Sequence, residues 1–342
     1  MARIFTDGFE LGAWHPWMNL GSHASITTGS KRSGDRGLHL DQEPETITGY
    51  AGDRYITLPV TRTDTELYFR AAMRFPGMDT GFGKDFYVLD EDGVTLMYLD
   101  ISTTAMNLYV LGALQDTWEP VGGISNATWY LVEVHFVQDA SSGTVEVRVD
   151  GTVRLSFTGT TKSTGDVIRQ FRLAAEKGAH DVYMDDVAIN DTTGSADTSW
   201  PGEGKIILLT PNANGDSSEW TGSDSDQTDN YALVDDVPND GDTTYVQTSD
   251  ADMTDLYGLS SYTLAAGEAV RGVQVLAVAR CVTAESDTLK LGVKSTAEHF
   301  GDAQALTTGY ATYVGDWLAT NPDTLAAWSQ SDLDDLQAGI QS

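Results

Sequence analysis

One stretch of this chain constrains its fold more than any other, because apolar and polar residues alternate through it without a break. The order is Thr144, Val145, Glu146, Val147, Arg148 and Val149. Successive side chains of a strand point to opposite faces, so the pattern predicts an antiparallel strand with one buried face. Asp150 and Gly151 follow as turn residues before another apolar run, which predicts a hairpin.

Similar short runs, rich in β-branched and aromatic residues, recur along the chain. In the first half they cover residues 55–58, 67–75, 86–89, 94–99, 129–137 and 182–189, and residues 90–93 are expected to form a hairpin loop. In the second half they cover residues 206–209, 231–234, 244–248, 270–283 and 288–293, after a polar loop expected over 212–230. No long helical period interrupts them. We therefore predict an all-β protein of two tandem antiparallel β-sandwich (jelly-roll) domains.

Chain length and composition place the domain boundary. The chain has 342 residues, enough for two domains of ordinary size. Residues 191–204 are polar and rich in Gly, Ser and Thr, so we expect a first domain over 1–190, a linker over 191–204 and a second domain over 205–342. A short C-terminal helix is expected as well, capped by Ser331, running through Leu333 and Leu336, and ending before Gly339.

The charge of the chain excludes two classes of partner. Asp and Glu number 51 against 20 Lys and Arg, which gives a net charge of −31. Phosphate backbones and anionic membranes are repelled by such a surface, so neither nucleic-acid binding nor binding to anionic membranes is expected. No stretch approaches about 18 uncharged apolar residues, so membrane insertion is not expected either. Cys281 is the single cysteine, which rules out an intrachain disulfide, and its apolar surroundings predict a buried residue.

Several segments resemble known families. The opening residues 5–12, followed by Trp14, the hairpin over 143–151 and the run over 182–189 together resemble concanavalin A-like and carbohydrate-binding-module jelly rolls. The segments 240–246, 273–275, 279–280 and 321–328 are similar to C-terminal parts of virion proteins of tailed bacteriophages. The resemblance implies a jelly roll followed by a second β-rich domain.

From this resemblance we expect a non-enzymatic virion structural protein of a tailed phage, serving as a capsid decoration, head fibre or tail fibre component. Its expected partners are other virion proteins and host-surface glycans, and a trimer is expected by analogy with fibres. No signal peptide is visible at the start of the sequence, so assembly in the host cytoplasm and release by lysis are expected. The alternative is a glycan-binding module or a polysaccharide-degrading enzyme of the concanavalin A-like fold.

Common catalytic motifs are missing from the sequence. Glucanases of the resembled fold carry carboxylates at close alternating spacing, of the type Glu-x-Asp-x-x-Glu, and Glu133 and Glu146 do not fit it. Both are expected on the solvent face. A Gly-x-Ser-x-Gly elbow and a His-Glu-x-x-His motif are also missing. The expectation is a protein without catalytic residues.

The resemblance also implies a structural Ca²⁺ held by Glu10 and by Asp186 in the last strand, since hard oxygen ligands suit this ion. The alternative is that Asp185 and Asp186 are ordinary surface carboxylates.

Five aromatic residues are candidates for stacking against sugar rings, because their faces suit the CH-rich surfaces of sugars. They are Trp14, Trp17, Tyr50, Tyr55 and Trp118. The alternative is that they pack in the core or between domains.

Overall fold

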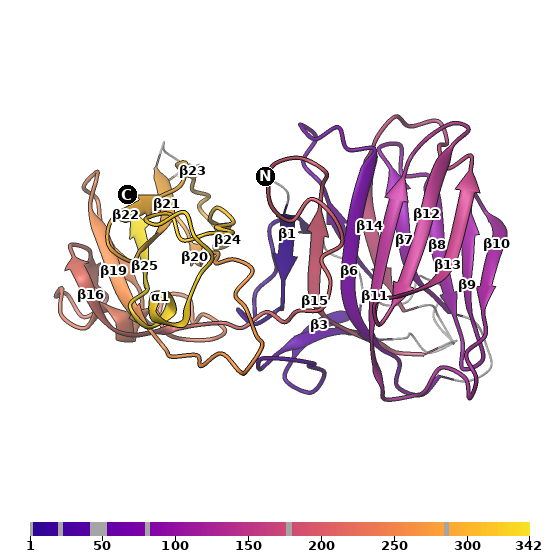
Figure 1. Ribbon diagram of the computed structural model, residues 1–342. Coiled ribbons are helices and arrows are strands. Elements are labelled where there is room, and N and C mark those ends of the chain that lie inside the picture. The colour runs from indigo at the N-terminus through magenta and orange to yellow at the C-terminus, as the bar shows by residue number, and fades with distance from the viewer. Residues whose placement is uncertain (1–2, 20–22, 42–52, 79–82, 176–179, 284–286) are drawn as a thin grey trace. The chain divides into compact units, whose positions relative to one another are not determined.

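The computed structural model describes residues 3–19, 23–41, 53–78, 83–175, 180–283 and 287–342. The chain divides into two compact units (Figure 1). The first unit comprises Met1–Glu10 and Trp17–Ile207, and the second comprises Leu11–Pro16 and Leu208–Ser342. The prediction of an all-β chain with a short helix near the C-terminus is confirmed.

The first unit is built from two antiparallel sheets. Among its described residues, sheet A has the strand order β13-β12-β11-β6-β15-β4-β3, with β1 also paired to β15, and sheet B has the order β10-β9-β8-β7-β14-β5-β2 (Figure 1). The strands of sheet A are β1 (Arg3–Asp7), β3 (Ala24–Thr27), β4 (Gly37–Leu40), β6 (Glu66–Arg74), β11 (Trp129–Val137), β12 (Gly143–Val149), β13 (Thr152–Gly159) and β15 (Val182–Asn190). The strands of sheet B are β2 (Met18–Asn19), β5 (Asp53–Thr57), β7 (Gly83–Asp90), β8 (Thr95–Ile101), β9 (Met106–Val110), β10 (Ala113–Trp118) and β14 (Ile168–Ala174).

Aromatic residues from both sheets meet in the core of the first unit. The ring of Phe69 in β6 lies 4.4 Å from that of Phe86 in β7 and 5.4 Å from that of Phe171 in β14. All three side chains are fully buried. Offset and tilted ring pairs at such distances add about 0.5–1.5 kcal/mol each to the burial of apolar area. The two sheets therefore pack face to face as a β-sandwich.

The hairpins predicted from alternation are confirmed. In β12 the valines at 145, 147 and 149 are buried and the residues between them are half-buried. Between β7 and β8 the chain turns at Gly93, whose φ of +76° needs a residue without a Cβ, and Gly93 N donates to Asp90 O. Alternation of this kind sets the register, since a slip of one residue would expose every valine.

Strand β15 carries a bulge at Asp186. Its pairing with β6 shifts register between Asp185 and Ala188, and Asp186 has a left-handed φ of +55°. Bulges bend a strand and re-aim a side chain, and they are frequent beside functional sites. The bulge is what turns the Asp186 carboxylate out of the regular ladder.

The segment predicted to be a linker is docked on the first unit. Arg148 Cζ lies 3.8 Å from the ring centroid of Trp200, and this ring meets that of Tyr68 edge-on at 5.4 Å. Gly202 N donates to Glu133 at 2.6 Å, and Arg70 donates to Gly202 O at 3.0 Å. The unit boundary therefore lies after Ile207, later than the sequence suggested, because an aromatic anchor and two hydrogen bonds hold the polar segment in place.

The second unit is organised around one antiparallel sheet, sheet C. In the part of this unit that the structure describes, its order is β16-β19-β25-β21-β22, with β23 also paired to β21, and the pairs β17-β18 and β20-β24 stand apart from it. Its strands and helices are β16 (Pro211–Ser218), β17 (Thr221–Gly222), η1 (Asn230–Leu233), β18 (Val246–Gln247), β19 (Thr254–Leu259), β20 (Leu276–Ala279), β21 (Thr288–Lys294), β22 (Glu298–Phe300), β23 (Gln304–Ala305), β24 (Ala311–Val314), α1 (Gln330–Asp334) and β25 (Gln337–Gln341). Two small apolar clusters fill it, one on Leu289, Leu291 and Tyr313 and one on Val293, Trp328 and Leu336.

Some sequence predictions for this unit are wrong. Residues 211–218 form the edge strand β16 and not a loop, because an edge strand needs few apolar side chains. Residues 231–234 were expected to be a strand, but the 3₁₀ helix η1 covers Asn230–Leu233. The strand expected over 270–283 shrinks to β20. Cys281 is buried, as predicted.

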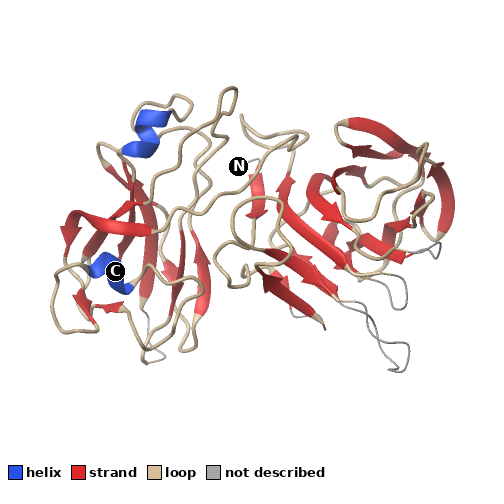
Figure 2. Cartoon of the chain, turned by 90° about the horizontal axis from the view of Figure 1, so that it is seen from below, coloured by secondary structure: helices blue, strands red, loops and turns tan. Residues whose placement is uncertain are grey.

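The C-terminal helix begins and ends earlier than predicted. Ser329, not Ser331, is the N-cap, and with Asp332 it forms a capping box. Gly339 does not end the helix but lies in β25, between β19 and β21. A Cβ at this position would lie 2.6 Å from Leu256 Cδ2, so the glycine serves close packing across the sheet. Figure 2 shows how little of the chain is helical, and within the described residues no helix has both the length and the apolar character needed to cross a membrane.

Candidate functional site

Four tyrosines and one arginine form a row that crosses sheet B from strand to strand. Tyr55, Arg172, Tyr87, Tyr98 and Tyr109 pair in that order across β5, β14, β7, β8 and β9. We call these five residues the tyrosine row. Neighbouring strands are about 4.8 Å apart, so the row is roughly 19 Å long.

The tyrosine row faces away from the core. Each of its members is half-buried, whereas the residues beside it in the strands, such as Ile56, Phe86 and Leu99, are at most 1% exposed. Successive side chains in a strand alternate between faces, so the row lies on the outer face of sheet B.

The rings of the row stand against one another. Tyr98 and Tyr109 stack with centroids 4.5 Å apart and planes 8° apart, and Tyr87 lies 5.6 Å from Tyr98. Arg172 Cζ lies 5.7 Å from the Tyr55 centroid and 4.8 Å from that of Tyr87, and it is held between them. Rings that stack on each other cannot all offer a free face. The row therefore presents mainly ring edges and phenol groups, with the Arg172 guanidinium placed between two of the rings.

Polar residues line the tyrosine row on one side. Lys84, Asp100, Asn107 and Thr117 pair across β7, β8, β9 and β10, and Asp100 and Asn107 lie two residues from Tyr98 and Tyr109 in their strands. The Lys84 ammonium is 5.4 Å from the Tyr98 ring centroid, and Thr117 Oγ1 donates to Asn107 Oδ1 at 2.9 Å. This outer face thus combines hydrogen-bonding groups of both kinds with two cations in a strongly acidic chain.

The five aromatic residues singled out from the sequence are not brought together as one platform. Tyr55 belongs to the tyrosine row. Trp118 is in β10 with Arg154 Cζ 5.1 Å from its ring centroid, and Trp17 lies 6.3 Å from Phe5, centroid to centroid. Trp14 falls in Leu11–Pro16, which belongs to the second unit, and Tyr50 lies outside the described residues. Tyr87, Tyr98 and Tyr109 were missed, although Tyr87 and Tyr98 lie in runs predicted to be strands. Tyr109 lies outside every run predicted to be a strand.

Glu10 and Asp186 come together at one loop. Glu10 Oε2 accepts from Asp35 N at 2.7 Å and from Arg36 N at 3.2 Å. Asp186 Oδ2 accepts from Arg32 at 2.9 Å, and its Oδ1 accepts from Ser33 Oγ at 2.8 Å. The loop over residues 32–36 thus joins the two carboxylates predicted to bind Ca²⁺.

These carboxylates belong to a larger acidic group with Asp7 and Asp185. Burial raises the pKa of Asp7 to about 7, and burial together with the charge of Asp186 raises that of Asp185. Burial also raises the pKa of Glu10. Asp185 and Asp186 are fully buried, so the alternative that they are ordinary surface carboxylates is excluded.

The chemistry of this acidic group fits a hard cation. Four carboxyl groups gather where Arg32 is the cation in direct contact with Asp186, and a bound cation would relieve the cost of their charge. Gly34 lets the loop approach closely, because a Cβ there would lie 2.1 Å from Glu10 Oε1. Glu10 and Asp186 would hold the ion. Calcium binding stays a prediction, tested below.

Glu133 is buried and not on the solvent face, which corrects the sequence prediction. It is 2% exposed and pairs opposite Arg70 and Arg148 on the neighbouring strands. Burial raises its pKa. The docked segment around Gly202 covers Glu133. Because Gly202 is far from Glu133 in the chain, the residues next to Glu133 give no indication of this burial.

Comparisons with known proteins assign the chain to no family. No protein-family model matches it, and no curated protein matches it. Similar solved structures include a cellulose-induced protein, Cip1, at 17% identity and a TM-score of 0.43, covering 58% of this chain and 100% of that one. They also include a Chlorella virus alginate lyase, vAL-1, at 12% identity and a TM-score of 0.38, covering 51% and 90%, and a sialidase at 14% identity and a TM-score of 0.40, covering 56% and 18%. None of these names links the chain to a virion.

The prediction of a non-enzymatic protein is corrected by these comparisons. Alginate lyases and sialidases are among the similar structures, at low identity and TM-score. The motifs that the sequence lacks are the carboxylate spacing of glucanases, the Gly-x-Ser-x-Gly elbow and the His-Glu-x-x-His motif. The lack of such motifs therefore does not separate binding from catalysis.

Proposed function

We propose that the first unit binds an extended polysaccharide across the tyrosine row of sheet B. The observation that carries this proposal is the continuous pairing of Tyr55, Arg172, Tyr87, Tyr98 and Tyr109 over five neighbouring strands on an outer face. A roughly 19 Å strip on a rigid sheet suits a chain that lies across several strands.

The groups on the strip suit sugars by hydrogen bonding more than by stacking. Tyrosine hydroxyls donate and accept, and Asn107 lies beside them, although it is only 7% exposed and its Oδ1 accepts from Thr117. The mutual stacking of Tyr98 and Tyr109 fixes their rings, so little side-chain entropy is lost on binding.

The two cations favour acidic sugars. The Arg172 guanidinium is held between two rings, and its planar fork matches a carboxylate. Lys84 lies further along the strip over Tyr98. The chain as a whole carries a net charge of −31 and repels polyanions, so Arg172 and Lys84 make this strip the place on sheet B where an acidic polymer would be repelled least.

Affinity electrophoresis in gels containing a polyuronate or a neutral glucan tests the proposal. We expect retardation by the polyuronate, weakened by Arg172→Gln and Tyr98→Ala. Tyr310→Ala is the matched control, since Tyr310 is a 41% exposed tyrosine of the second unit. Retardation by neither polymer, or equal retardation of all variants, would contradict the proposal. New chain ends after incubation would show that the same face also cleaves its ligand.

We also propose that the chain is a virion structural protein of a tailed phage, as predicted from the sequence. It rests on the phage-like segments of the second half, such as 240–246 and 321–328. Mass spectrometry of purified particles tests it, and light scattering tests the trimer. Absence from particles would remove the virion role and leave the polysaccharide proposal in place.

A further inference from the structure

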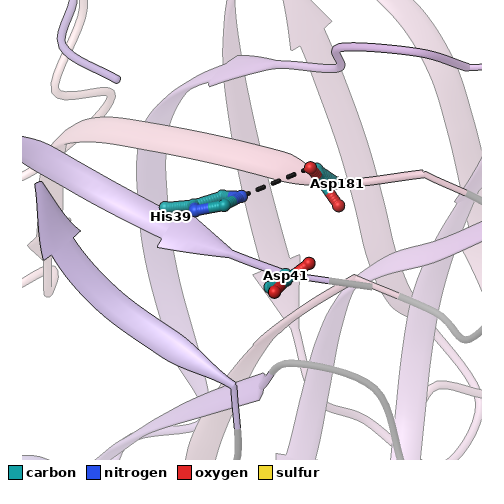
Figure 3. Close-up of side chains that lie close together, drawn as sticks. All are labelled: His39, Asp41 and Asp181. Atoms are coloured by element: carbon teal, nitrogen blue, oxygen red, sulfur yellow. Dashed lines mark ion pairs between the residues drawn. The ribbon is translucent and has the colours of Figure 1, made fainter. Parts of the chain in front are cut away.

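The structure gathers one histidine and two aspartates at the edge of sheet A, away from the tyrosine row. His39 is in β4, Asp41 lies just after this strand, and Asp181 lies just before β15 (Figure 3). The pairing of Val182 with Leu40 and of Tyr183 with His39 runs antiparallel. Continued by one residue, this register sets Asp181 opposite Asp41.

Strand geometry puts these side chains on one face. His39 and Asp41 are two residues apart, as are Asp181 and Tyr183, so each pair points to the same side of its strand. Figure 3 shows the His39 ring directed toward Asp181, with Asp41 below this pair in the view. The three side chains therefore lie close together because of the register of β4 and β15, and not because of the rotamer of a single side chain.

The distances suit a small divalent ion. One ligand atom from each of the three residues lies within 4.8 Å of the others, and His39 Nε2 is 3.4 Å from Asp181 Oδ2. Donors about 2.0–2.2 Å from a tetrahedral zinc ion are about 3.3–3.6 Å apart. The His39–Asp181 edge already has this length, and exposed Asp41 needs only a side-chain adjustment to complete the set.

The histidine nitrogen that faces the aspartate has no hydrogen bond. Among the described residues, His39 Nε2 is buried and meets no partner with hydrogen-bond geometry, although Asp181 is near. A buried nitrogen without a hydrogen bond is costly unless another ligand satisfies it. A metal ion between the two side chains would supply that ligand.

The imidazole is also positioned by its neighbours. Its ring meets that of Tyr183 edge-on, with centroids 4.7 Å apart and planes 72° apart. Arg74 Cζ in turn lies 5.5 Å from the Tyr183 ring centroid. Such supporting contacts orient a metal-binding histidine before the ion arrives.

We propose that His39, Asp41 and Asp181 form a site for a divalent transition metal of the zinc class. An imidazole with two carboxylates suits zinc, cobalt or manganese, whereas calcium and magnesium take oxygen ligands. The ion joins β4 to the start of β15 and so holds the β3–β4 edge on sheet A. The three ligands leave coordination positions open on the solvent side, where Asp41 is exposed.

Titration of the metal-free protein with Co²⁺ and Zn²⁺ tests this site. We expect one Co²⁺ to bind with visible absorption bands, Zn²⁺ to displace it, and Ca²⁺ at the same concentration to leave the bands unchanged. His39→Ala should weaken binding at least tenfold, and Asp181→Asn should weaken it while keeping the side-chain volume.

His135→Ala is the matched control, because His135 pairs with Glu66 at 2.8 Å on the same sheet and belongs to no cluster of three ligands among the described residues. This variant should bind as the unmodified chain does. If the unmodified chain shows no saturable binding, the proposal is overturned. It is also overturned if His39→Ala and Asp181→Asn, with folding verified by circular dichroism, both bind with unchanged affinity.

Discussion

The rings of Tyr98 and Tyr109 stack 4.5 Å apart and nearly parallel, on the neighbouring strands β8 and β9. The two residues are direct cross-strand partners in sheet B, so the register of β8 and β9 itself brings their rings together. Cross-strand aromatic pairs contribute to sheet stability as well as to the shape of the surface. The same two rings thus both stabilise the sheet and form one end of the tyrosine row.

Removing one ring of this stack should weaken the first unit. We expect Tyr109→Ala to lower its free energy of unfolding by about 1–2 kcal/mol, since the ring pair and some buried area are lost together. Urea unfolding followed by tyrosine fluorescence and circular dichroism measures this. Tyr109→Phe should recover most of the loss, because phenylalanine can still stack. Equal losses in both variants would show that the hydroxyl, and not the stack, stabilises the sheet.

The contact between Arg148 and Trp200 should hold the segment over residues 191–204 on the first unit. Trp200→Ala should destabilise this unit by about 1–2 kcal/mol, because it removes a cation–π contact and ring packing on Tyr68. Limited proteolysis should then cut within 191–204 much faster than in the unmodified chain. Trp200→Phe is the control and should protect the segment in part. Rapid cutting of the unmodified chain would contradict the docking.

The acidic group should make the first unit less stable as pH rises. The pKa of Asp7 is raised from 3.8 to about 7, so the unfolded chain releases this proton at lower pH than the native chain. The contribution of protonated Asp7 to the free energy of unfolding is fully present below about pH 4, and it is lost as the pH rises through about 7. The loss is at most about 4 kcal/mol, because the side chain of Asp7 is half-buried and not fully enclosed. Asp7→Asn should flatten this part of the pH profile of urea unfolding. An unchanged profile in the variant would contradict the assignment to Asp7.

Calcium should reverse that loss if Glu10 and Asp186 bind it. At a calcium concentration 100 times the dissociation constant, the first unit should gain about 2.7 kcal/mol, and EDTA should remove the gain. Glu10→Gln should abolish the response, since it removes a charge and keeps the volume. Differential scanning calorimetry in calcium, EDTA and sodium chloride measures this. A gain of equal size from sodium chloride would show charge screening and not a calcium site.

The sequence predicted best those parts of the fold that depend on local patterns. The alternating valines of β12 and the turn at Gly93 are local patterns, and each is enough to predict its own hairpin. Edge strand β16 and the cap at Ser329 were missed, because a polar edge strand resembles a loop and Ser331, two residues after Ser329, has the same preference for the N-cap. The burial of Glu133 depends on a segment nearly 70 residues away, which no local pattern reveals.

The candidate sites show the same limit. The meeting of Glu10 and Asp186 at one loop agrees with the resemblance that pointed to them. The tyrosine row could not be read from spacing along the chain, because its members come from five strands and meet only through their register. Alternation within a strand determines which residues share a face, but only the order and register of the strands in sheet B align these five residues.

The most direct test of the account is the affinity of the chain for a polyuronate, measured by titration calorimetry, before and after substitution of Arg172. The account predicts saturable binding that weakens with salt, a loss of at least tenfold in Arg172→Gln, and no change in Tyr310→Ala. Binding with the same affinity in Arg172→Gln, or no binding of the unmodified chain to any acidic or neutral polysaccharide, would contradict it.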